Sequence, residues 1–425
     1  MKKKKASLGR RMKEFVRTSV VWGPLDHNLF FTIIFLNVYG IIMVYSASYN
    51  NSITKNYSYF MNNQLKNVIF GFIIMIIASY INYHRIVRFG WGWFWLFLAV
   101  CIIAALKTPL AHSELGATRW IKLGSISFQA AEPIKAAIII FFAYYVSYWG
   151  LNRWYNQVLA CLLAIALLGF LFFFSNNLST VIVLFCICAV IILSSVKKPD
   201  LYWYFLIGLA LVIIAAIGVT VYLLMHQGAE NFRFVRIRAW LHPEEYAADE
   251  GLQAMQARYA IGAGGFWGKG LGQSLIKFKL SYSYNDFILA IICEELGVFG
   301  VIVMMTLFGY LLYRIYKIAQ NAWDIEGKVL AIGVFTQIAL QLLINVMVVT
   351  SVIPTTGVTL PFFSAGGTSV VFLLAELGMV LNVDKYAKER RFFEEAERHV
   401  AQMEERGGIG AAGWRRRLDS ARTHR

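Results

Sequence analysis

Three acidic residues stand close together in the stretch SYSYNDFILAIICEELGVFG, residues 281–300. Asp286 lies where a long polar loop gives way to an apolar run, and Glu294 and Glu295 follow inside that run. A charge in the hydrocarbon of a membrane is costly and tends to mark a functional path. A carboxylate at the edge of such a run could accept a proton at a membrane surface. We therefore expect the rest of the chain to hold Asp286 there and to bring basic groups to it.

The composition is that of a membrane protein. Of the 425 residues, 58% are hydrophobic and only 15% are charged, whereas a soluble domain carries about 25% charged residues. Apolar runs of about 20 residues predict transmembrane helices. We therefore predict an all-α polytopic membrane protein with about ten transmembrane helices, at residues 29–46, 67–81, 89–106, 132–149, 157–174, 178–195, 201–225, 286–310, 329–349 and 368–383.

Basic residues predict how these helices are oriented. Positive charge gathers in residues 1–22, in the tail after Asp384 and in short loops that an even number of spans puts on the same side. Cytoplasmic loops carry such an excess, so we expect both termini in the cytoplasm, facing anionic lipid. Nucleic acid is not an expected partner, because no stacking motif is interleaved with these charges. The chain divides into a basic tail (1–28), a transmembrane domain (29–384) and a charged C-terminal tail (385–425).

The opposite side of the membrane has the largest loop, residues 226–285, between the seventh and eighth spans. Its glycine-rich part, GAGGFWGKGLGQS (262–274), which we call the glycine-rich loop, is expected to give turns and close approach of backbones. Cations on this side break the charge bias: Arg119 and Lys122 in loop 107–131 and Lys277 in the large loop, with Lys269 and Lys279 as weaker candidates. Because guanidinium and ammonium groups bind phosphate oxygens, these cations suggest an anionic ligand. Solvated loop charges or contacts with lipid headgroups are the alternative.

Two pairs of charged residues have a structural explanation beside the functional one. Glu132 and Lys135 are three residues apart and share one helical face, so they could pair with each other as well as contribute to a site. Glu294 and Glu295 lie about two to three turns into the helix after Asp286, where pairing or cavity lining is favoured over catalysis. We expect no protein-bound metal, because no HExxH or similar ligand spacing is present.

Five stretches, taken together, point to one family. They read VYSAS (44–48), GATRWIKLG (116–124), IGAGGFWGKGLG (261–272), YNDFILAIICEELG (284–297) and PTTGVTLPFFSAGGTS (354–369). In this order and with this number of spans, the chain resembles the SEDS family of bacterial cell-wall synthases, the FtsW, RodA and SpoVE proteins. The segment TTGVTLPF (355–362) is more similar to the division and sporulation members of the family than to the elongation member. The likeness covers nearly the whole membrane domain and leaves both tails outside.

The resemblance implies a peptidoglycan glycosyltransferase in the bacterial cytoplasmic membrane, with the division septum as one expected location. Such an enzyme polymerises lipid II, the undecaprenyl-pyrophosphate-linked disaccharide peptide. It works with a class B penicillin-binding protein and with division or elongation proteins. The family's essential acid corresponds to Asp286, its RW arginine to Arg119, and its Glu and Lys to Glu132 and Lys135. A divalent cation could accompany the pyrophosphate. The family's usual QPSE is replaced by QAAE at residues 129–132.

Polymerising lipid II requires a base for the attacking sugar hydroxyl and cations for the departing pyrophosphate. Asp286 is the expected base, and capping of the helix that follows it is its alternative role, since Asp is a favoured N-cap. Two other functions could use the same surface: a lipid II flippase, which needs no base, and a scaffold that only recruits a penicillin-binding protein. Asn also caps well but cannot accept the proton. Asp286→Asn therefore separates a catalytic Asp286 from one that only caps the helix, and it would have no effect on a scaffold.

Overall fold

The computed structural model describes residues 21, 23–48, 59–114, 117–123, 126–175, 177–196, 232–242, 244–245, 250–278, 280, 284–365, 367–405 and 414–415. The chain is mainly helical. Its elements are α2 (His27–Ser48), α3 (Tyr59–Tyr80), α4 (Tyr83–Val87), η1 (Phe89–Gly92), α5 (Trp93–Ala105), β1 (Ala111–Glu114), β2 (Ala117–Leu123), β3 (Ile126–Gln129), α6 (Ala131–Trp149), α7 (Trp154–Ser175), α8 (Leu178–Ser195), α10 (Phe232–Leu241), α11 (Glu250–Gly264), η2 (Ile276–Phe278), α12 (Ile288–Gln320), α13 (Ile325–Val349) and α14 (Thr368–Glu405).

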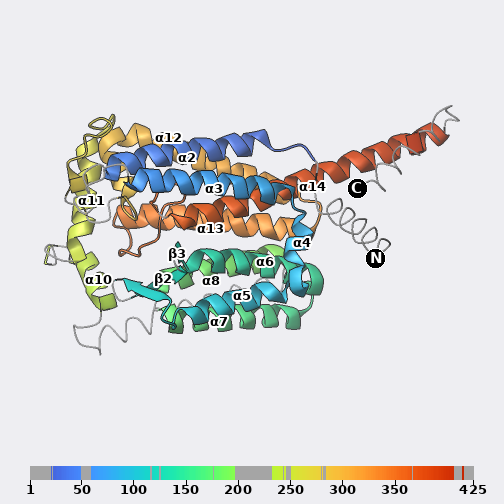
Figure 1. The fold of residues 1–425 in the computed structure, drawn as a ribbon, viewed down its shortest axis with the longest axis horizontal. Helices are drawn as coiled ribbons and strands as arrows, with labels where there is room; N and C mark the ends of the chain where they lie inside the picture. Colours follow the sequence, from blue (N-terminus) through green and yellow to red (C-terminus); the bar gives the residue numbers. More distant parts are fainter. Residues whose placement is uncertain are drawn as a thin grey trace, which may run out of the picture.

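The long helices run side by side along the longest axis of the molecule (Figure 1). α13 is central, because it packs against α12 and α14 on one side and against α6 and α8 on the other. α10, α11 and the strands lie toward one end of the bundle, which we call the α11 end. α4 lies at the other end, and α14 projects beyond the bundle there.

Six of the described helices are long and apolar enough to cross a membrane: α2, α3, α7, α8, α12 and α13. They coincide with six of the expected apolar runs. α6 and α14 coincide with two more, although both carry charged residues, and α5 is shorter. The run expected at residues 201–225 lies outside the described residues. A bundle of apolar helices is therefore confirmed, while the number of ten spans and the side on which the termini lie are still predictions.

The prediction of an all-α chain is wrong for the loop before α6, which forms a three-stranded antiparallel sheet in the order β1-β2-β3. Trp120 lies opposite Gln129, and Ile121 lies opposite Phe128. Aromatic and β-branched residues favour strands, and Ile121 is buried against the bundle. A search for long apolar runs does not detect strands of this length, because each has only 4 to 7 residues.

The boundary expected at residue 384 falls inside a helix, since α14 runs without interruption from Thr368 to Glu405. Lys385, at the start of the expected tail, is only 1% exposed. Its Nζ lies 3.4 Å from the centre of the Tyr80 ring and donates a hydrogen bond to Ser79 Oγ at 3.4 Å. A buried ammonium group requires such compensation. The first turn of the tail is therefore packed against α3, and the exposed part begins near residue 390.

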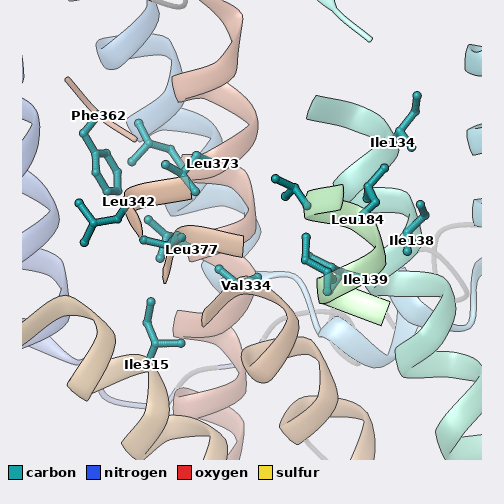
Figure 2. Packing of buried hydrophobic residues seen from close by; sticks show 14 of the residues in the cluster. Ile134, Ile138, Ile139, Leu184, Ile315, Val334, Leu342, Phe362, Leu373 and Leu377 are labelled. Atoms are coloured by element: carbon teal, nitrogen blue, oxygen red, sulfur yellow. The ribbon is translucent and has the colours of Figure 1, made fainter. Parts of the chain in front are cut away.

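Apolar side chains from both sides of α13 form a continuous core around it (Figure 2). Ile139 of α6 and Leu184 of α8 lie on one side of Val334, and Leu377 of α14 lies on the other. Gly333 lets α6 approach closely, because a Cβ at that position would be 2.6 Å from Cγ2 of Ile139. This tight packing gives rigid support to the polar residues that α6, α8 and α13 carry at the α11 end.

Candidate active site

Asp286 lies in a turn, residues 284–287, directly before α12. The helix begins at Ile288, and the N-cap position is held by Phe287, whose side chain makes no capping hydrogen bond. A favoured capping side chain would stand at the N-cap position itself, and Asp286 lies one residue before it. Its side chain is partly exposed.

Two buried polar side chains hold this turn. Asn345 of α13 donates from Nδ2 to the backbone carbonyl oxygens of Asp286 and Val358, both at 2.9 Å. Ser364 donates from Oγ to the carbonyl oxygen of Asn285, also at 2.9 Å. Asn345 is fully buried and Ser364 is 2% exposed, so water competes little for these bonds. The turn with Asp286 is therefore fixed to α13 and to the loop before α14.

A polar pocket lies beside this turn, between α6, α8, α13 and the loop before α14. It has ≈ 30 Å³ of space for water-sized groups, room for roughly two water molecules. A second pocket shares Glu132, Gln341 and Thr359 with the first and continues along the loop to α14. We call the two together the polar cavity. The first part is lined by Gln129, Ala131, Glu132, Lys135, Asn177, Ser179, Thr180, Val183, Gln341, Gly357, Val358 and Thr359.

Glu132 and Lys135 form a buried ion pair in the polar cavity. Nζ of Lys135 lies 2.9 Å from the carboxylate of Glu132, and the residues are 2% and 4% exposed. The pairing that their spacing left open as one alternative is present, and each charge compensates the desolvation of the other. Because both residues also line the cavity, the pair presents an acid and a cation to whatever binds there.

Arg119 and Lys122 both lie on β2. Arg119 directly precedes Trp120, which lies opposite Gln129 in the sheet, and Gln129 lines the polar cavity. The strand register therefore brings the backbone of Arg119 to the rim of the cavity. Lys122 is exposed and lies opposite Ser127, two positions further from Gln129.

Lys277 is not on the exposed surface where a cation for a ligand was expected. Its side chain is 1% exposed, donates from Nζ to the carbonyl oxygen of Gly272 at 2.7 Å, and lies 3.5 Å from Oε1 of Glu295. Lys269, the weaker candidate, forms an ion pair with Glu294 at 2.8 Å. A buried carboxylate needs a cationic partner, so both acids hold lysines against the bundle. Residue 279 lies outside the described residues.

Glu294 and Glu295 also bind backbone and hydroxyl groups at the end of the glycine-rich loop, at residues 274–276. Glu294 accepts hydrogen bonds from Oγ of Ser274 and from the backbone N–H groups of Leu275 and Ile276. Glu295 accepts from Oγ of Ser46 on α2 at 2.5 Å. Both acids are fully buried. The structural role that the sequence favoured for them is confirmed: they attach this loop to α12 and α2.

α12 is interrupted at Gly297, where φ is 64° and ψ is −162°. The break frees backbone groups that bond to the glycine-rich loop: the N–H of Lys269 donates to the carbonyl of Glu294, and the N–H of Val298 donates to that of Gly265. A Cβ at Gly297 would lie 2.4 Å from the oxygen of Phe266. The expected close approach of backbones at these glycines is confirmed.

The sequence reasoning missed the polar face of α13. Gln337, Gln341 and Asn345 follow one another at intervals of four residues, so they share one face of the helix. Gln341 lines the polar cavity and Asn345 holds the turn of Asp286. Buried amides at this spacing in an otherwise apolar run were a readable signal, because a polar group is seldom buried in a membrane helix without a role.

Within the described ranges, no group of three or more His, Cys, Asp or Glu side chains is placed so that it could hold a metal ion. Acid–base and electrostatic chemistry is what the residues around the polar cavity can supply. Asp286 could accept a proton, while Lys135 and the β2 cations could stabilise an anion.

A family model described as Cell cycle protein, FTSW_RODA_SPOVE, matches residues 26–389. A probable peptidoglycan glycosyltransferase FtsW from Trichlorobacter lovleyi is 33% identical over 384 residues, which is 88% of this chain and 96% of the relative. Stage V sporulation protein E from Bacillus subtilis is 33% identical over 370 residues, covering 84% and 96%. A solved chain of a peptidoglycan synthase complex that coordinates polymerization and crosslinking has the same fold, with a TM-score of 0.71, 23% identity, and coverage of 86% and 99%.

Proposed function

The chain belongs to the FtsW, RodA and SpoVE family of cell cycle proteins, and we propose that it is a peptidoglycan glycosyltransferase. Its proposed substrate is lipid II, which it polymerises into glycan strands at the outer face of the bacterial cytoplasmic membrane. The α11 end of the bundle, with the polar cavity and Asp286, is then the outer end. Relatives that cover most of this chain are named for this activity.

Asp286 is the general base in this proposal. Its carboxylate accepts the proton of an acceptor sugar hydroxyl while that oxygen attacks the anomeric carbon of the donor. The bond from the anomeric carbon to the pyrophosphate oxygen breaks, and the undecaprenyl pyrophosphate leaves with the bonding electrons. Attack from the opposite face inverts the anomeric centre. A positioned base of this kind contributes about 100-fold or more to the rate.

Cations at the cavity offset the charge of the departing pyrophosphate. Lys135 is the proposed inner cation, held by Glu132 at 2.9 Å, and Arg119 with Lys122 on β2 form the rim. Lys277 is left out of this set, because its side chain is buried against Glu295.

One observation carries the assignment: the same amide, Asn345, holds the carbonyl of Asp286 and the carbonyl of Val358. Val358 lines the polar cavity together with Glu132 and Lys135. The proposed base and the proposed cation therefore belong to one rigid wall, as a reaction with a proton acceptor and an anionic leaving group requires.

A class B penicillin-binding protein is the proposed partner, because a chain of the same fold comes from a peptidoglycan synthase complex. We propose that the chain works with division proteins at the septum, because its relatives include FtsW proteins and a sporulation protein.

The test is glycan-strand formation from purified lipid II by the purified full chain, with and without its partner synthase. We expect Asp286→Asn to lose about 100-fold or more of the polymerisation rate while its elution profile and unfolding temperature stay those of the wild type. Glu394→Gln, the same acid-to-amide change on the exposed part of α14, is the matched control and keeps the activity.

The outcomes separate the other two functions. Retained activity in Asp286→Asn would exclude Asp286 as the base. A wild-type protein that moves lipid II across vesicle membranes without making strands would be a flippase. A protein that does neither, yet supports growth equally well with Asp286→Asn, would be a scaffold for the penicillin-binding protein.

A further inference from the structure

Glu376 is a buried acid that the proposed reaction does not use. It lies on α14 within the run expected to cross the membrane, and it is only 1% exposed. Nε2 of Gln337 on α13 donates a hydrogen bond to its Oε2 at 2.7 Å. Among the described residues, its other oxygen, Oε1, has no hydrogen-bond partner, and neither has Oε1 of Gln337. Unsatisfied buried oxygens are costly, so this pair of side chains lacks one donor.

The charges around Glu376 do not balance if it is ionised. The charged groups that act on it are Lys135 and Glu132 of α6, and Lys135 is already paired with Glu132 at 2.9 Å. α13 faces it with the amide of Gln337. Within the described part of the chain, the other elements that contact α14 (α3, α4, α12 and β3) add no charge to it. Two carboxylates and one ammonium would leave a net negative charge in the bundle interior, where an unpaired charge is expensive.

We propose that Glu376 binds a proton and forms a neutral acid–amide pair with Gln337. A protonated carboxyl supplies one O–H donor. In the proposed pair the proton is on Oε1 of Glu376 and is donated to Oε1 of Gln337; both of these oxygens lack a partner among the described residues, so a single proton satisfies both. The second hydrogen bond of the pair, from Nε2 of Gln337 to Oε2, is already present.

The neutral pair has a consequence for the polar cavity. Gln341, about one helical turn from Gln337, lines the cavity together with Lys135 and Glu132. While Glu376 is neutral, Lys135 remains with Glu132 and is available to an anionic group in the cavity. An ionised Glu376 attracts Lys135 toward the bundle interior instead. Glu376 is thus a positioning residue that acts through Lys135, a role that rests on the proposed function.

Infrared spectroscopy of the purified full chain in lipid vesicles tests the proton itself, because a protonated carboxyl has a C=O band that a carboxylate lacks. We expect Glu376→Gln to remove one such band from the wild-type spectrum. Glu394→Gln, the same change at an exposed acid of the same helix, leaves that band in place. Gln337→Leu shifts the band without removing it, because the O–H group loses its acceptor. A wild type without the band, or a band that survives in Glu376→Gln, would overturn the proposal.

The positioning role is tested by the rate of glycan-strand formation across pH. When the pH rises and Glu376 loses its proton, Lys135 is drawn from the cavity and the wild-type rate falls; Glu376→Gln stays neutral. We expect the ratio of the rate at alkaline pH to that at neutral pH to be about twofold or more higher in Glu376→Gln than in the wild type. Equal ratios would refute the positioning role. A wild type that makes no strands would instead refute the proposed function, and the infrared spectrum still decides whether Glu376 holds a proton.

Discussion

Gly297 has a backbone conformation, φ 64° and ψ −162° inside α12, that essentially only glycine adopts. Gly297→Ala forces a Cβ into this position. That atom would lie 2.4 Å from the amide nitrogen of Gly268 and 2.4 Å from the carbonyl oxygen of Phe266. Both are backbone atoms and cannot rotate away, so the glycine-rich loop must separate from the break in α12.

Two contributions set the expected loss of stability: backbone strain at residue 297 and the hydrogen bonds that are lost when the loop separates. A residue with a side chain held in this region costs about 1–3 kcal/mol. Separation of the loop also breaks backbone hydrogen bonds across the break, including those from the N–H groups of Val298 and Phe299. Two such bonds contribute about 2 kcal/mol in all. We therefore expect Gly297→Ala to lower the free energy of unfolding by about 3–5 kcal/mol.

The assay is thermal unfolding of the purified protein in detergent, followed by intrinsic tryptophan fluorescence, with loss of polymerisation as a second readout. Gly309→Ala is the matched control, because Gly309 lies in the same helix and a Cβ there would meet nothing within 4 Å. A helical Gly→Ala change at such a site is neutral or stabilises by up to about 1 kcal/mol. If Gly297→Ala unfolded at the wild-type temperature, the account of the break as a glycine-dependent junction would be wrong.

Two further predictions concern carboxylates that are paired with a basic side chain, the buried Glu294 and the partly exposed Asp324. Glu294→Gln breaks the ion pair with Lys269 and should lower the free energy of unfolding by roughly 3 kcal/mol, whereas Glu394→Gln in an exposed pair should change it by no more than about 0.5 kcal/mol; similar losses in both, measured by chemical unfolding, would contradict this. Asp324, between α12 and α13, is subject to burial that raises its pKa, but the hydrogen bond from His84 and those from its other partners outweigh burial, so its pKa is lowered from 3.8. A lowered folded-state pKa means that this carboxylate stabilises the fold above its ordinary pKa and that the stabilisation is lost as the pH falls through the folded-state value. The unfolding temperature of the wild type should therefore drop on acidification below about pH 4, and Asp324→Asn, which retains an N-cap side chain, should show a smaller drop.

Much of the architecture was predictable, because the hydrophobic requirement of a membrane span is local. Runs of apolar residues located α2, α7, α8 and α13 to within a few residues. Spacing on a helix, which is also a local property, put Glu132 and Lys135 on one face and allowed the pair that the structure has. The small sheet was missed, because its strands are too short to give a run.

The sequence by itself determined that a bundle of apolar helices would carry Asp286 at the end of one helix and that glycines would bring backbones together nearby. Tertiary structure decided which cations face the cavity. Lys277 and Lys135 are both lysines near the predicted site, yet Lys277 is turned inward to Glu295, while Lys135 lines the cavity beside Glu132. The partner of a charge is set by which helices pack together, and that depends on contacts between residues as far apart as Ser46 and Glu295. Composition and periodicity describe each helix alone, so they cannot contain this information.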